Sequence, residues 1–318
     1  MSDQSKYIWF NGAMVPWKEA KVHVMSHAIH YGSGVWEGIK CYKTEDGPAI
    51  FKLDGHIRRL YNSAKNYDIN IPYSPNEIKK ACINVVDVNE FDSCYIRPIA
   101  FYGFDTLGVH PKDCPVEVSV ASFYWGAYLG EDSLQNGVRV TISPWKRLSL
   151  NAFPPSTKAS GHYLNSLLAV QDARKRGFDE AILFNEDNLI AEGSGQNIFI
   201  VKNNEIFTNS EDASILMGIT RETVIELCNE LNIKIHVTNI SGDMLNDADE
   251  AFFTGTATEV TPIASIDDRP VNTGEPGEIT LKLRDIYLDI AHGKNPKYKK
   301  WLTLTEKHKD LDLSSLNI

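Results

Sequence analysis

The sequence predicts an α+β protein made of two α/β domains. Three observations support this: a length of 318 residues, strand-like and helix-like segments that follow one another in both halves, and a glycine-containing linker at Gly126–Glu131. We therefore expect a small N-terminal α/β domain over residues 1–126, an interdomain linker over 127–136 and a large C-terminal domain over 137–318.

The charge and composition of the chain argue against several classes of partner. Its 42 Asp and Glu residues outnumber 32 Lys and Arg residues, and the net charge is -10, so we expect neither nucleic acid nor an anionic membrane as a main partner. No apolar run is long enough to span a bilayer, and the first residues do not resemble a signal peptide. The five scattered cysteines form no C-x-x-C pair and indicate reduced thiols, so we expect a cytoplasmic protein.

The N-terminal segment is predicted to contain a strand at Tyr7–Phe10 and a short strand at Val22–Val24. The three histidines of this region lack a carboxylate or cysteine at ligand spacing, so we expect no metal site among His23, His27 and His30. The glycines around Tyr31 and Trp36 indicate backbone that lies close to a ligand or a partner chain. An ordinary glycine-rich turn explains them nearly as well.

Two amphipathic helices come next. The first is expected at Asp54–Asp68, capped by its first aspartate. It carries Arg58 and Arg59, which suit either the protein surface or a phosphate group. The segment Ser74–Glu77 is a capping box with proline at the first helical position, so a second helix is predicted to begin there.

A strand that begins at Tyr95 displays two polar side chains. Alternation along Tyr95–Pro98 puts Tyr95 and Arg97 on the same face, where they could bind an anion or take part in a structural salt bridge. A loop at Leu107–Val109 and a strand at Val116–Phe123 follow before the linker.

Lys158 lies in a cramped segment of small residues. Pro154 and Pro155 stop any helix before it, and a helix is predicted from His162 to Gly177. A lysine held in such a place can have a lowered pKa and act as a nucleophile or base. A surface lysine in a loop is the simpler alternative.

The C-terminal half continues with four strands joined by Asn, Asp and Gly turns, at Glu180–Phe184, Leu189–Glu192, Asn197–Val201 and Glu205–Thr208. Glu192 ends an apolar strand, and a carboxylate buried there needs a partner. Gly218 leads into a helix predicted at Thr220–Leu231, whose start suits a phosphate group or is simply an ordinary cap. The last predicted elements are a strand at Glu250–Thr254, a turn at Gly255–Glu259 and a helix at Gly277–His292.

Several of these segments together resemble the signatures of a known family, the branched-chain amino acid aminotransferases. In the second half the matching motifs are T-K-A-S-G-H-Y-L-N-S, A-E-G-S-G-Q-N-I-F, G-I-T-R and G-T-A-T-E. In the first half they are W-F-N-G, H-V-M-S-H-A-I-H-Y-G, E-G-I-K and Y-I-R-P. The resemblance implies a pyridoxal 5'-phosphate enzyme of fold type IV, with the fold of D-amino acid aminotransferase.

The resemblance also implies a role for each matching residue. Lys158 would bond to the cofactor aldehyde and later carry a proton, and Glu192 would pair with the pyridine nitrogen. The other cofactor contacts would come from Arg59, Tyr163, Ile219, Thr220 and Thr256. The substrate would be bound by Tyr31, Trp36, Tyr95, Arg97, Val109, Tyr128, Thr256 and Ala257, with Tyr31 and Val109 reaching across a dimer interface.

The implied reaction moves the α-amino group of leucine, isoleucine or valine to 2-oxoglutarate, reversibly and by a ping-pong mechanism. The implied partners are small amino acids and 2-oxo acids, and the implied assembly is at least a homodimer, with a trimer of dimers left open. Three residues depart from the family pattern and bear on substrate range: Trp36 in place of phenylalanine, Gln196 in place of glutamate and Lys40 in place of arginine.

Two alternatives stay open. One is another activity of the same fold, a D-amino acid aminotransferase or a lyase such as aminodeoxychorismate lyase, although the Y-I-R-P strand and the G-T-A turn favour the branched-chain enzyme. The other is a non-catalytic protein that only binds pyridoxal phosphate, which the joint presence of Lys158, Glu192 and Tyr163 disfavours.

Overall fold

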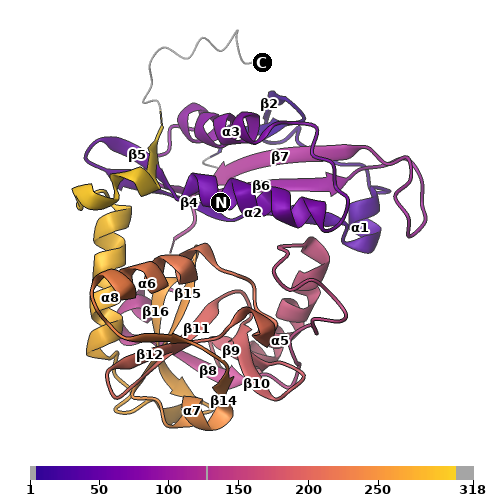
Figure 1. Cartoon of the computed structure of the whole chain (residues 1–318). Helices are drawn as coiled ribbons and strands as arrows, with labels where there is room; N and C mark the ends of the chain where they lie inside the picture. The colour runs from indigo at the N-terminus through magenta and orange to yellow at the C-terminus, as the bar shows by residue number, and fades with distance from the viewer. Residues whose placement is uncertain (1–4, 127, 306–318) are drawn as a thin grey trace. The chain divides into compact units, whose positions relative to one another are not determined.

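The computed structural model describes residues 5–126 and 128–305. Within them the chain packs into two units, each with its own sheet (Figure 1). Of the described residues, the first unit contains 5–125, 157–161 and 289–305, and the second contains 126, 128–156 and 162–288. Lys158 therefore packs with the first unit, whereas the sequence prediction assigned it to a domain over 137–318.

The first unit is built on an antiparallel sheet with the strand order β18-β5-β4-β6-β7-β1-β2, and β3 pairs with β6. Its strands are β1 (Tyr7–Phe10), β2 (Ala13–Pro16), β3 (Gly34–Trp36), β4 (Ile39–Thr44), β5 (Gly47–Phe51), β6 (Cys94–Tyr102), β7 (Val116–Phe123) and β18 (Leu302–Leu304). Its helices are α1 (His27–Tyr31), α2 (Leu53–Lys65) and α3 (Pro75–Val88), with a 3-10 turn at Pro296–Trp301. Helices α2 and α3 pack together and bury apolar residues at helical spacing against the sheet (Figure 1).

Local sequence signals predicted the existence of these helices more accurately than the residues at which they begin and end. The capping box is confirmed, since the Ser74 hydroxyl accepts a hydrogen bond from the N–H of Glu77 and the Glu77 carboxylate accepts one from the N–H of Ser74. The N-cap of α2 is Lys52 in a left-handed conformation, so the prediction of Asp54 as the cap is wrong. The strand predicted at Val22–Val24 is also wrong, because those valines are 43% and 68% exposed and lack the burial that would stabilise a strand.

The second unit is built on a mixed sheet with the strand order β13-β12-β11-β15-β16-β8-β9-β10-β14, and β17 pairs with β16. Its strands are β8 (Val138–Ile142), β9 (Glu180–Phe184), β10 (Leu189–Gly193), β11 (Asn197–Lys202), β12 (Glu205–Thr208), β13 (Ile235–Val237), β14 (Ile240–Ser241), β15 (Glu250–Gly255), β16 (Glu259–Ile266) and β17 (Arg269–Pro270). Its helices are α4 (Glu131–Asn136), α5 (Tyr163–Lys175), α6 (Ile219–Glu230), α7 (Gly242–Asn246) and α8 (Glu278–Ala291), and 3-10 turns lie at Ser160–His162 and Glu211–Ala213.

The elements predicted for this half of the chain are confirmed within a few residues. The strands β9 to β12 and the helices α5, α6 and α8 form where apolar periodicity and turn residues indicated them. Helix α5 connects the parallel strands β8 and β9, as a crossover helix must. No helix within the described residues combines the length and apolar character needed to cross a membrane.

Candidate active site

Backbone contacts fix the segment that carries Lys158. Its N–H donates to Oγ of Ser63 at 3.1 Å, and its carbonyl accepts from the N–H of Trp36 at 3.0 Å. Gly161 donates its N–H to the carbonyl of Gly32 at 3.1 Å, and a Cβ added to Gly32 would lie only 2.8 Å from the Gly161 Cα atom. The glycine-rich stretch therefore supports the lysine-bearing segment by direct backbone contact.

The side chain of Lys158 is buried beside two arginines. Burial and the charge of Arg59 lower its pKa from 10.5 to about 8. Arg97 adds to this effect, while Glu37 and Tyr95 oppose it. A much larger fraction of the amine is then unprotonated near neutral pH than in an ordinary lysine, as a nucleophile requires. Burial excludes the alternative of a surface lysine in a loop.

Arg59 is held by a buried carboxylate that was not predicted from the sequence. Glu37 accepts hydrogen bonds from Nε and Nη2 of Arg59 at 2.6 and 2.9 Å, and from Nδ1 of His56 at 2.7 Å. Burial opposes ionisation of Glu37, but attraction to Arg59 and the hydrogen bonds from His56 and Arg59 hold its pKa well below the usual range. Burial lowers the pKa of His56, which favours the neutral imidazole, and Nδ1–H of that ring donates to the Glu37 carboxylate. Glu37 is the first residue of the E-G-I-K motif, and this motif was the sequence signal that could have identified it as a site residue.

Strand β6 carries Tyr95 and Arg97 as predicted. The guanidinium carbon of Arg97 lies 5.3 Å from the centre of the Tyr95 ring, and Nε of Arg97 is buried with no hydrogen-bond partner among the described residues. A Cβ at Gly38 would collide with the Tyr95 hydroxyl, so a larger residue there would displace the Tyr95 ring. A donor left unsatisfied favours an anion-binding role over a structural salt bridge.

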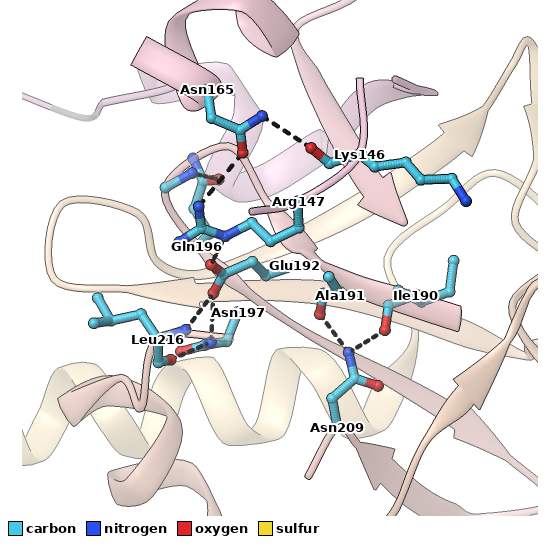
Figure 2. Close-up of polar contacts among 11 residues, drawn as sticks. Lys146, Arg147, Asn165, Ile190, Ala191, Glu192, Gln196, Asn197, Asn209 and Leu216 are labelled. Carbon is cyan, nitrogen blue, oxygen red and sulfur yellow. Dashed lines mark hydrogen bonds and ion pairs between the residues drawn. The ribbon is translucent and has the colours of Figure 1, made fainter. Parts of the chain in front are cut away.

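In the second unit the carboxylate of Glu192 is the centre of a buried polar cluster (Figure 2). Its Oε1 atom accepts from Nε of Arg147 at 2.7 Å, and its Oε2 atom accepts from Nδ2 of Asn197 and from the N–H of Leu216, each at 3.1 Å. The partner that a buried carboxylate needs is therefore Arg147, which was not predicted from the sequence. The available sequence signal was the basic segment Trp145–Arg147, which precedes the lysine-bearing segment.

A β-bulge sets the direction of Glu192. The pairing of β10 with β9 shifts between Ile190 and Glu192, so Ala191 is an extra residue on β10. The amide nitrogen of Asn209 donates to the carbonyl of Ile190 at 2.9 Å and to that of Ala191 (Figure 2). Arg221 in turn donates to the carbonyl of Asn209 at 2.6 Å. Asn209 therefore satisfies both carbonyls at the bulge and fixes the residue that follows it.

The N-terminus of α6 is open to an anion. Gly218 is the N-cap, and no side chain makes a capping hydrogen bond there. A Cβ at Gly218 would collide with the side-chain oxygen of Asn197. The first turn includes the buried residues Ile219 and Thr220. Because no side chain caps its backbone N–H groups, they are more available to a phosphate group than those of an ordinary capped helix.

Comparisons with known proteins agree with this geometry. The family model for amino-transferase class IV matches residues 34–266. The branched-chain-amino-acid aminotransferase of Pseudomonas aeruginosa is 42% identical over 306 residues, which cover 96% of this chain and 99% of that one. The crystal structure of a T.th. branched-chain amino acid aminotransferase with pyridoxamine 5'-phosphate is 46% identical and superimposes with a TM-score of 0.92, covering 95% of this chain and 99% of that one.

The chain belongs to the branched-chain amino acid aminotransferases. The family resemblance and the fold type IV inferred from the motifs are thus confirmed. Two further structures of the T.th. enzyme contain N-(5'-phosphopyridoxyl)-L-glutamate and 4-methylvaleric acid. Each is 44% identical to this chain and superimposes with a TM-score of 0.91. Each match covers 95% of this chain and 99% of the other chain.

The predicted site residues of this aminotransferase fall into two groups. The first unit brings together Trp36, Arg59, Tyr95, Arg97 and Lys158. In the second unit Thr256 and Ala257 are half-buried in the turn between β15 and β16, and Tyr163 is half-buried at the start of α5. Tyr128 is 38% exposed before α4.

Tyr31 and Val109 differ from the buried Lys158 in being exposed. They are 45% and 83% exposed. The ring nitrogens of His27 form hydrogen bonds with Oγ of Ser33 at 2.7 Å and with the carbonyl of Gly108 at 2.8 Å, so the helix of Tyr31 and the loop of Val109 are tied together. Among the described residues no group of three or more His, Cys, Asp and Glu side chains is arranged to hold a metal ion.

Proposed function

We propose that this aminotransferase uses pyridoxal 5'-phosphate to move the α-amino group of leucine, isoleucine or valine to 2-oxoglutarate, reversibly and by a ping-pong mechanism. The observation that carries the proposal is the buried Lys158 with a pKa of about 8 in a chain of this family. When bound, the cofactor supplies an aldehyde that reacts with amines and a ring that accepts electrons.

Each of the two units offers groups whose chemistry fits this cofactor. Lys158 offers an unprotonated amine for the aldehyde, and Glu192, fixed by Arg147 and Asn197, offers a carboxylate for the pyridine nitrogen. The phosphate contacts are assigned to Arg59, Ile219, Thr220 and Thr256, and the contact to the phenolic oxygen to Tyr163. The amine of Lys158 would also serve as the base: it would take up the proton that leaves the substrate Cα atom and would pass it to the aldehyde carbon of the cofactor.

The substrate contacts follow from the same residues. Tyr95 and the N–H groups of Thr256 and Ala257 bind the α-carboxylate, and an apolar side chain packs on Trp36, Tyr128 and Tyr163. Arg97 binds the second carboxylate of glutamate, because its planar guanidinium matches a carboxylate and its Nε lacks a partner among the described residues. Structures of the similar T.th. enzyme contain a glutamate adduct and 4-methylvaleric acid, which supports the proposal that the site accepts both an acidic and an aliphatic side chain.

We assign the active form to at least a homodimer, with Tyr31 and Val109 at the interface. Large apolar side chains are exposed on this part of the first unit, including Ile29, Tyr31 and Val109. Sedimentation of the wild type and of Val109→Asp tests this, and an active wild-type monomer would exclude it. The same experiment distinguishes a dimer from a trimer of dimers. All five cysteines are free and buried, which suits the reducing cytoplasm, where we place the protein.

A coupled assay with leucine and 2-oxoglutarate tests the reaction. We expect glutamate and 4-methyl-2-oxopentanoate in equal amounts, and no product without the 2-oxo acid acceptor. Product formed without an acceptor would indicate a lyase, and activity with D-leucine alone would indicate a D-amino acid aminotransferase. Failure to turn over any amino acid, with cofactor bound, would indicate a non-catalytic protein.

A further inference from the structure

The indole ring of Trp36 lies next to two cations of the candidate site. The guanidinium carbon of Arg97 is 4.0 Å from the ring centre, and Nζ of Lys158 is 4.2 Å from it. Both distances are within the range of cation–π attraction, for which tryptophan is the strongest natural ring. The ring of Trp36 therefore contacts both the guanidinium of Arg97 and the amine that reacts.

Arg97 needs such a contact when no carboxylate is bound. The residue as a whole is half-buried, but its Nε is buried without a hydrogen-bond partner among the described residues, and leaving a buried donor unpaired is costly. An aromatic face offsets part of this cost without using any hydrogen-bond donor. An aliphatic substrate offers no carboxylate for its side chain, so this state recurs in each catalytic cycle.

A guanidinium that contacts the face of a ring also keeps its hydrogen-bond donors available. A guanidinium group presents its flat face to an aromatic ring and its N–H groups at the edge. A carboxylate can bind bidentately at that edge while the face stays against the indole. The guanidinium therefore does not have to leave Trp36 in order to bind an acidic side chain.

We propose that Trp36 is a positioning residue that determines specificity, because its ring holds the guanidinium of Arg97 in one place whether the substrate side chain is acidic or aliphatic. This inference rests on the role proposed above for Arg97. Trp36 stands at a position where the family pattern has phenylalanine. Its larger ring orients Arg97 before the substrate binds, which favours the acidic substrate.

Equilibrium binding of two unreactive acids to the holoenzyme tests the inference without turnover. Glutarate carries two carboxylates, as glutamate does, and 4-methylvaleric acid has the side chain of leucine. In Trp36→Phe, which keeps an apolar ring but weakens the cation–π contact, we expect the Kd for glutarate to rise about threefold to tenfold and that for 4-methylvaleric acid to change less than about twofold. Trp36→Tyr should give an intermediate Kd for glutarate.

A double-mutant cycle separates this inference from the role of Arg97 itself. Arg97→Ala should weaken glutarate much more than 4-methylvaleric acid, and adding Trp36→Phe to it should have no further selective effect. The inference is overturned if Trp36→Phe weakens both acids equally, or if its selective effect persists without Arg97. If Arg97→Ala itself weakens both acids equally, the proposed function of Arg97 fails instead.

Trp301 offers a matched control. Its ring contacts Nζ of Lys52 at 3.7 Å, so Trp301→Phe removes a tryptophan–cation contact of the same kind. We expect this variant to bind both acids as the wild type does, and thermal melting of each variant checks that it is folded. A selective loss of glutarate binding in folded Trp301→Phe would show that the effect is not specific to Trp36, and would contradict the inference.

Discussion

Nε of Arg147 donates a hydrogen bond to Oε1 of Glu192 at 2.7 Å, and only 9% and 6% of the two side chains are exposed. Removing one partner leaves the other charge buried and unpaired, which typically costs about 3–5 kcal/mol. We therefore expect Arg147→Met to lower the free energy of unfolding by about this amount in urea denaturation, and to weaken the absorbance of the bound cofactor.

The exposed pair of Arg139 and Asp268, with side chains 55% and 72% exposed, is the matched control. Arg139→Met should change the free energy of unfolding by less than about 1 kcal/mol, because solvent screens such pairs. An equal loss of unfolding free energy in the two variants would show that the buried pair of Arg147 and Glu192 stabilises the fold no more than an exposed pair does.

The reactivity of Lys158 should follow its lowered pKa. Since burial and Arg59 lower this pKa to about 8, the unprotonated amine becomes the main form above that pH. The rate at which the cofactor-free enzyme reacts with an amine-acetylating reagent at Lys158, followed by peptide mass spectrometry, should rise with pH and level off above about 8. Exposed Lys146 serves as the internal control. An inflection near 10 for Lys158 would contradict the assignment.

Gln196 is paired with a buried acid. Its Nε2 donates to Oε2 of Glu180 at 2.9 Å, and burial raises the pKa of Glu180. In Gln196→Glu two carboxylates would face each other, and each would raise the pKa of the other. We expect the variant to lose about 1–3 kcal/mol of unfolding free energy at pH 8.

The loss from Gln196→Glu should shrink as the pH falls toward 5. An acid whose pKa is higher in the folded than in the unfolded protein destabilises the fold only above its unfolded pKa, so protonation removes the penalty. Denaturant unfolding at several pH values measures this, with the exposed Gln171→Glu as the control. A loss that does not depend on pH would indicate a packing defect instead.

Asn209 should affect Glu192 through the bulge. Asn209→Ala leaves the carbonyls of Ile190 and Ala191 without their shared donor, so we expect a loss of about 1–3 kcal/mol in unfolding free energy. A less firmly held Glu192 should also lower kcat by about tenfold with little change in KM, on the scale of one lost hydrogen bond. Asn239→Ala, at a half-buried position in the same unit, is the control. Loss of stability with unchanged kcat would mean that Asn209 serves only the fold.

The sequence predicted those features that depend on local chemistry. Apolar periodicity located most strands and helices, and the small residues around Lys158 indicated a confined lysine. Glu192 was recognised because a carboxylate that ends an apolar strand needs a partner. Caps and short exposed strands were less predictable, as Asp54 and Val22–Val24 illustrate, since tertiary contacts decide them.

The partners of the site residues could not be predicted in this way. Arg147 is 45 residues from Glu192 along the chain, and Glu37 is 22 residues from Arg59. Such pairs form because the sheet order brings distant segments together, and nothing local in the sequence encodes that order. Asn209 was missed for the same reason, because its role depends on a bulge in a neighbouring strand.

Borohydride reduction of the holoenzyme followed by peptide mass spectrometry tests most directly whether Lys158 is the residue that bonds to the cofactor. We expect the reduced cofactor on the peptide that contains Lys158, loss of that label when leucine is added before reduction, and its return when 2-oxoglutarate is then added. Lys158→Ala should carry no label there. Labelling of another lysine, or a label on Lys158 that leucine does not remove, would contradict the account.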